Sequence, residues 1–129
     1  MPSFHEVTTT AAAPEEVWKL LYDPSRFPDW WAGVGTVEPG ANGGYTMYPA
    51  GYPDFPMAQM LDTQRDSGRV VVSCLVSDLR FQWGLEPDGE GTRISVDVEI
   101  PEREAHRLEG QQEQIRRSMS RLAELAAQA

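Results

Sequence analysis

Alternating apolar and polar positions run through the second half of the chain and predict strands. In residues 79–86 the odd positions are apolar, and in residues 93–100 the even positions are apolar. A period of two is typical of a strand with one buried and one solvent-facing side. Turn residues at 66–68 and 88–89 separate these runs from their neighbours and predict hairpins. Residues 36–101 are therefore expected to form a mostly antiparallel sheet.

The first third of the chain predicts one more strand and two short helices. Residues 4–10 are rich in β-branched side chains, which favour a strand. Pro14 stands where a helix begins, because its missing N–H costs nothing at the first helical position. Asp23 is expected to cap a second short helix that Pro24 begins and that ends before Gly33.

After residue 101 the apolar positions change to the period of a helix, which predicts about 26 helical residues at the C-terminus. The inward stripe of this helix is expected to contain Leu108, Gln112, Ile115, Met119, Leu122 and Ala126. Gln112 is the polar member of the stripe, with Gln111 on its flank. Burying an amide without a partner costs about 1–3 kcal/mol. Gln112 is therefore expected to bond to a ligand or, alternatively, to a strand backbone or solvent.

Three segments resemble one known superfamily. Ala13-Pro14-Glu15-Glu16-Val17-Trp18 is similar to an A-P-x-x-V-W motif that opens its first helix, residues 23–31 resemble its second helix, and residues 85–93 resemble its last hairpin. This is the START-like (SRPBCC) superfamily, which includes polyketide cyclases and pollen-allergen-type binding proteins. The resemblance covers nearly the whole chain as one domain, residues 1–129. It implies an α+β helix-grip fold, in which a curved antiparallel sheet of about seven strands wraps around a long C-terminal helix.

The resemblance also implies a cavity between sheet and helix that takes a hydrophobic small molecule, without a fixed cofactor. The residues indicate the same region independently, because aromatic and methionine side chains gather in residues 27–60 and are typical of pockets for flat apolar ligands. The candidate ligand-binding residues are Trp31, Tyr45, Met47, Tyr48, Phe55, Gln59, Phe81, Trp83, Gln112 and Ile115. The proline-rich segment 49–56 is either a lid or a rigid connection.

Charge and composition narrow the class of partner. Twenty acidic residues against 11 basic ones give a net charge of −9, which disfavours nucleic acids and anionic membranes. No apolar run reaches the roughly 20 residues of a membrane span, so no membrane insertion is expected. No secretory signal is visible at the N-terminus, and the one cysteine excludes an internal disulfide. A cytoplasmic protein with no metal site is expected.

No familiar catalytic motif is present in the sequence, and the catalytic residues stay unassigned. Cys74 lies among valines on its strand, which predicts a buried, inert thiol. Acid–base chemistry in the cavity would come from Glu6, Asp62, Tyr45 or Tyr48.

Three interpretations of function remain open. The first is binding of an aromatic or polyketide-like molecule, extending to cyclase or aromatase activity. The second is a protein-interaction module resembling activators of the Hsp90 ATPase. The pair Trp30-Trp31 is mildly similar to that branch of the superfamily. The third is a lipid or quinone carrier. A cavity larger than about 300 Å³, lined by Trp83, Tyr45 and Gln112, would favour the first or third, whereas a filled interior would favour the second.

Overall fold

The computed structural model describes residues 2–128, which contain one seven-stranded sheet. The strands are β1 (Ser3–Thr10), β2 (Val34–Pro39), β3 (Gly44–Pro49), β4 (Met57–Gln64), β5 (Arg69–Cys74), β6 (Arg80–Asp88) and β7 (Gly91–Glu99). All neighbours pair antiparallel, in the spatial order β1-β7-β6-β5-β4-β3-β2. The strand from the N-terminus thus lies beside the last strand. The predicted antiparallel sheet is confirmed.

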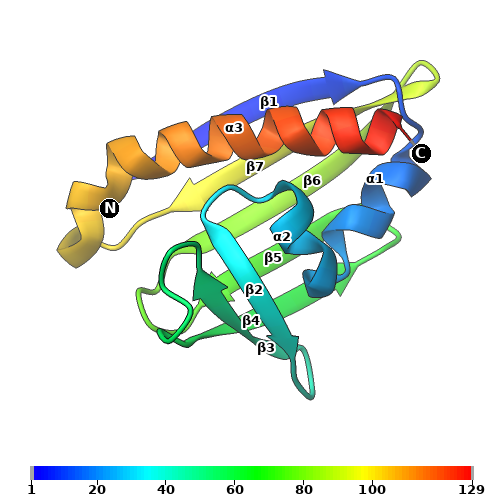
Figure 1. The fold of residues 1–129 in the computed structure, drawn as a ribbon. Coiled ribbons are helices and arrows are strands. Elements are labelled where there is room, and N and C mark those ends of the chain that lie inside the picture. Colours follow the sequence, from blue (N-terminus) through cyan, green and yellow to red (C-terminus); the bar gives the residue numbers. More distant parts are fainter. Residues whose placement is uncertain (1, 129) are drawn as a thin grey trace.

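The helices lie on one face of this sheet (Figure 1). They are α1 (Pro14–Leu21), the 3-10 turn η1 (Pro24–Arg26), α2 (Phe27–Trp30), the 3-10 segment η2 (Glu102–Arg107) and α3 (Leu108–Ala127). Asp23 caps η1 as predicted, since its carboxylate accepts the Ser25 backbone N–H at 3.0 Å. The long helix and the two short helices after β1 confirm the helix-grip fold. No helix in residues 2–128 has the length and apolar character to cross a membrane.

The C-terminal helix differs from the prediction at its start. Residues 102–107 form a 3-10 segment rather than α-helix, and Glu104 has the non-helical angles φ −112° and ψ 15°. Arg103 pairs with Asp78 and donates to the Ser77 carbonyl at 3.4 Å, which ties this segment to the turn between β5 and β6. The regular helix therefore has 20 residues. Its stripe is buried from Ile115 onward, as predicted, while Leu108 and Gln112 are only half-buried.

The core fills the space between the helices and the inner face of the sheet. The alternation predicted for β6 and β7 is confirmed, because Phe81, Trp83, Ile94 and Val96 are buried while the residues between them are more exposed. The sequence pattern does not decide which side of strand β5 is buried. In the structure, Val70, Val72 and Cys74 point into the core. The thiol of Cys74 is buried, as expected.

Ser118 ties α3 to the segment that follows α2. Its side chain is fully buried, its Oγ accepts the Ala32 backbone N–H at 2.9 Å, and it donates to the Gln114 carbonyl at 2.7 Å. This bond fixes the chain next to Trp31 against the helix.

Replacing Ser118 with alanine is expected to lower the free energy of unfolding by about 1–3 kcal/mol, because the Ala32 N–H would be buried without an acceptor. Urea denaturation measures this loss. Ser120→Ala, at an exposed position of the same helix, is the matched control and should change stability by less than about 0.5 kcal/mol. Equal losses in the two variants would contradict the role given to this bond.

Candidate ligand-binding pocket

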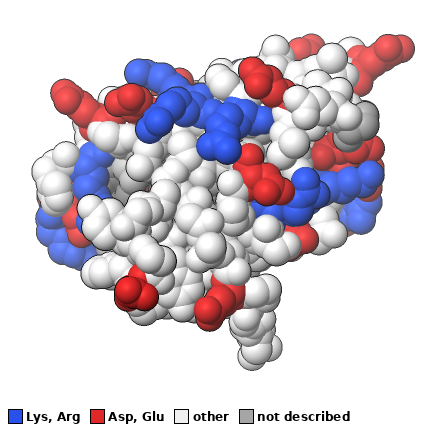
Figure 2. Space-filling model, viewed as in Figure 1, with Lys and Arg blue, Asp and Glu red and all other residues white. Residues whose placement is uncertain are grey.

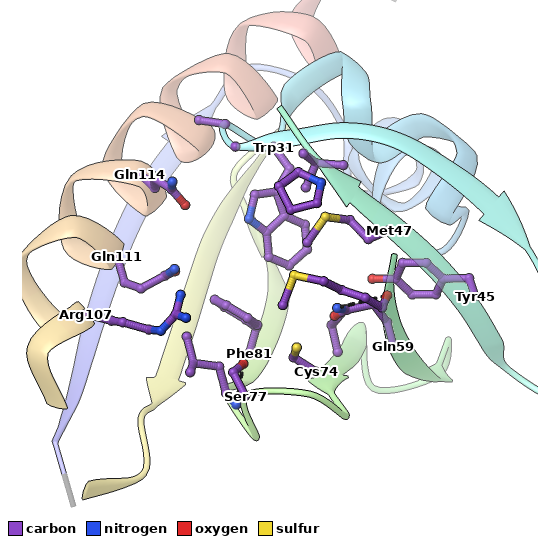
Figure 3. Close-up of a pocket in the computed structure, with 17 residues that line it drawn as sticks. Trp31, Tyr45, Met47, Gln59, Cys74, Ser77, Phe81, Arg107, Gln111 and Gln114 are labelled. Atoms are coloured by element: carbon purple, nitrogen blue, oxygen red, sulfur yellow. Dashed lines mark hydrogen bonds between the residues drawn. The ribbon is translucent and has the colours of Figure 1, made fainter. Parts of the chain in front are cut away.

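A half-open cavity of about 160 Å³ lies between the N-terminal part of α3 and the sheet. Strands β3 to β6, the segment after α2 and the start of α3 supply its walls (Figure 3). The volume is below the 300 Å³ typical of drug-sized sites. Apolar cavities of about 150 Å³ accommodate a single aromatic ring, so one ring would fill this one.

Aromatic rings form the rigid apolar wall of the cavity. Trp31 meets Phe81 edge-to-face, with ring centroids 5.0 Å apart. Its other side packs on Trp30 at 5.3 Å and on Trp83 at 5.4 Å. Because these rings surround Trp31, its indole is held in one orientation. Met47 and Met57 complete the apolar surface with flexible thioethers.

Tyr45 and Gln59 place polar groups at one end of the cavity (Figure 3). They are cross-strand partners on β3 and β4. Gln59 is 4% exposed, and its amide donates one long bond of 3.5 Å to the Met57 carbonyl. Burial, and to a lesser degree Cys74, raise the pKa of the Tyr45 hydroxyl. This hydroxyl therefore stays protonated at neutral pH, where it is a hydrogen-bond donor and a weak acid.

Arg107, Gln111 and Gln114 line the opposite end of the cavity from one side of the helix (Figure 3). Gly33, with φ +91°, lets the chain pass close to this row, because a Cβ there would lie 2.8 Å from Nε2 of Gln114. The Oε1 atom of Gln111 is buried without a hydrogen-bond partner among residues 2–128. The Nε of Arg107 donates to Glu104 at 2.8 Å, and this bond lowers the pKa of the Glu104 carboxyl.

The structure brings half of the candidate residues together around the cavity. These five are Trp31, Tyr45, Met47, Gln59 and Phe81. Of the four acid–base candidates, Tyr45 also lines the cavity. Asp62 is exposed, and Glu6 lies 3.4 Å from Arg116 in an ion pair.

The other five candidates lie elsewhere. Trp83 and Ile115 are buried in the core behind the cavity wall. Tyr48 follows Met47 on its strand and so points to the other face, where desolvation and Glu38 raise its hydroxyl pKa. Phe55 is 56% exposed in the segment 49–56. Gln112 is half-buried but does not line the cavity, because the neighbouring Gln111 occupies the side of α3 that does.

Sequence reasoning missed the row formed by Arg107, Gln111 and Gln114. The signal was present as polar residues at i, i+4 and i+7, which share one side of a helix. A polar row of this kind is also typical of a solvent-facing side, so the pattern alone could not separate the two. Among residues 2–128, no group of three or more metal-ligand side chains is close enough to hold a metal ion.

Residues 1–127 match the sequence profile of the family described as polyketide cyclase / dehydrase and lipid transport. The chain belongs to this family. The match confirms the resemblance to the SRPBCC superfamily that the helix motifs and the last hairpin carry. No curated protein matches the chain.

Solved structures show the family fold in proteins of low sequence identity. XoxI from Bacillus cereus superimposes with a TM-score of 0.76 at 13% identity, covering 96% of this chain and 94% of that one. CV1439 from Chromobacterium violaceum has a TM-score of 0.75 at 19% identity, covering 98% and 99%. BexL, a di-domain ARO/CYC protein from the BE-7585A biosynthetic pathway, has a TM-score of 0.79 at 14% identity, covering 96% of this chain and 46% of BexL. At such identities the likeness establishes the fold alone.

Proposed function

We propose that this protein binds a hydrophobic small molecule, aromatic or polyketide-like, in the cavity between α3 and the sheet. The observation that carries this proposal is the wall of Trp31 and Phe81, two rings at right angles that border a cavity of single-ring size. A single ring would pack on the indole face and fill the cavity. The half-open side leaves room for a longer aromatic molecule to extend outward.

The two alternatives have less support. Trp30 and Trp31, which suggested a protein-interaction module, are 0% and 6% exposed and so are not available to a partner. A lipid, or a quinone with a long apolar tail, needs more enclosed volume than about 160 Å³, whereas a single aromatic ring does not. In cyclase or aromatase chemistry, Tyr45 would donate a hydrogen bond to a substrate oxygen beside the bound ring. BexL supports this extension only through the shared fold.

The test uses toluene and naphthalene as apolar probes in a ¹H–¹⁵N NMR titration. The indole N–H signal of Trp31 is expected to shift, whereas the signal of Trp18, which lies away from the cavity, stays in place. Native mass spectrometry of the purified protein would identify any copurifying ligand. If neither probe moves the Trp31 signal at millimolar concentration, the proposed binding function is wrong.

Met57→Trp is expected to abolish toluene binding, because the larger side chain would occupy a cavity of single-ring size. Calorimetric titration measures the affinity. Met60→Trp is the matched control, since Met60 lies on the same strand but is 42% exposed and does not line the cavity. This control should bind toluene like the unmodified protein, and loss of binding in both variants would contradict the assignment of the site.

A further inference from the structure

The helix end of the cavity presents two hydrogen-bond donors beside one unpaired acceptor, the Oε1 atom of Gln111. The guanidinium of Arg107 and the amide nitrogen of Gln111 both point into the space (Figure 3). Glu104 accepts from the Nε of Arg107 at 2.8 Å, and the end of this half-exposed guanidinium points into the cavity (Figure 3). Planar forks of this kind favour an oxygen acceptor with two lone-pair directions, above all a carboxylate.

One basic side chain at this end faces the cavity, and Glu104 also pairs with it. Arg107 is the one charged side chain among the cavity-lining residues of the described chain. The neighbouring Arg103 is paired with Asp78, and His106 is exposed on the outer side, 3.8 Å from Glu104. Figure 2 shows further basic side chains over the middle of α3 on this face. The net charge of −9 opposes an anion only at long range, where salt screens it beyond about 8 Å.

The other surfaces fix how such a ligand would lie. Its ring would rest against the wall that Trp31 and Phe81 form, with one edge toward the methionines. The hydroxyl of Tyr45 and the amide of Gln59 lie at the far end of the cavity, across the apolar wall from Arg107 (Figure 3). The cavity is thus apolar in the middle and polar at both ends.

We propose that the ligand is a single-ring aromatic acid whose carboxylate binds Arg107 and Gln111. This inference rests on the proposed function, because it names the chemical class of ligand for the same cavity. A hydroxyl on the ring opposite the carboxylate would reach the end formed by Tyr45 and Gln59.

The test compares three probes of similar size, namely benzoate, its neutral relative benzamide, and toluene. NMR titration gives each dissociation constant, with the Trp31 indole signal reporting the ring and the Gln111 side-chain amide signal reporting the acid group. Benzoate is expected to bind about ten-fold more tightly than benzamide, since a charge-assisted hydrogen bond is roughly twice as strong as a neutral one. The Gln111 amide signal should shift with benzoate and stay in place with toluene.

Single substitutions test the contributions of Arg107 and Gln111 to benzoate binding separately. Arg107→Met should weaken benzoate binding about ten-fold and leave toluene binding unchanged. Arg117→Met is the matched control on α3, because its arginine is exposed and lies outside the cavity. Gln111→Leu should also weaken benzoate binding, whereas Gln112→Leu, one residue along the same helix, should not.

The outcomes distinguish this inference from the proposed function. Equal affinities for benzoate, benzamide and toluene, all unaffected by Arg107→Met, would overturn the aromatic-acid inference and leave apolar binding intact. If none of the three probes shifts the Trp31 signal, both proposals are wrong. If Arg117→Met weakened benzoate binding as strongly as Arg107→Met, the effect would come from the overall charge of the protein, and the assignment to Arg107 would be wrong.

Discussion

Trp30→Ala is expected to lower the free energy of unfolding by about 4 kcal/mol, at the upper end of the range for single core substitutions. Trp30 is fully buried, and its ring packs on Phe27, Trp31 and Trp83 with centroids 5.5, 5.3 and 5.2 Å away. Its Nε1 donates to the Leu20 carbonyl at 3.0 Å, which joins α2 to α1. The substitution would create a cavity and also leave that carbonyl without its donor. Urea denaturation, followed by circular dichroism, measures the loss.

The control for Trp30 compares the two most buried indoles of the described chain. Trp83 is 1% exposed, but its Nε1 has no hydrogen-bond partner within residues 2–128. Trp83→Phe removes a buried donor that is already unpaired, whereas Trp30→Phe breaks a bond and orphans a carbonyl. Trp30→Phe is therefore expected to cost at least about 1 kcal/mol more than Trp83→Phe. A larger loss for Trp83→Phe would show that packing alone, not this bond, sets the ranking.

Local sequence pattern predicts most of this fold because each element carries its own signal. Alternation in residues 79–86 and 93–100 requires one buried side, and the structure buries that side. Pro14 and Asp23 start their helices through backbone and capping chemistry that involves only neighbouring residues. The apolar pattern predicts a helix from residue 102, six residues before α3 begins. It misses the 3-10 segment because the contact of Arg103 with Asp78 joins segments that lie apart in the sequence.

The sequence predicts the candidate site only in part. Local alternation decides which side of a strand a residue faces, but the packing of distant segments decides whether that residue lies in the core or lines the cavity. Alternation places both Phe81 and Trp83 on the inner side of β6. Only the packing of α2 onto the sheet decides that Trp83 lies beneath Trp30 while Phe81 lines the cavity. In the same way, the stripe on α3 has a polar member, Gln112, and a polar flank at Gln111. The cavity opens on the flank of Gln111, because the segment after α2 and strand β3 supply the other walls there.

Trp31→Leu is expected to weaken toluene binding at least about ten-fold, because aromatic contact contributes beyond the area it buries. Leucine keeps part of the apolar volume but offers no flat face to a ring. The same substitution also removes ring contacts with Phe27 and Phe81, so a loss of stability of about 3 kcal/mol is expected beside it. Calorimetric titration at a temperature where the variant is fully folded separates affinity from stability.

Trp18→Leu is the matched control, because Trp18 is 7% exposed, close to the 6% of Trp31, yet lies outside the cavity. It stacks on Tyr22 at 6.0 Å and should lose comparable stability when replaced. A ligand that binds only the folded state raises the melting temperature, and the rise grows with the logarithm of its affinity. Toluene should therefore stabilise the Trp18 variant as it stabilises the unmodified protein, and stabilise the Trp31 variant much less. If toluene stabilised both variants equally, the ring of Trp31 would contribute to the core but not to ligand binding.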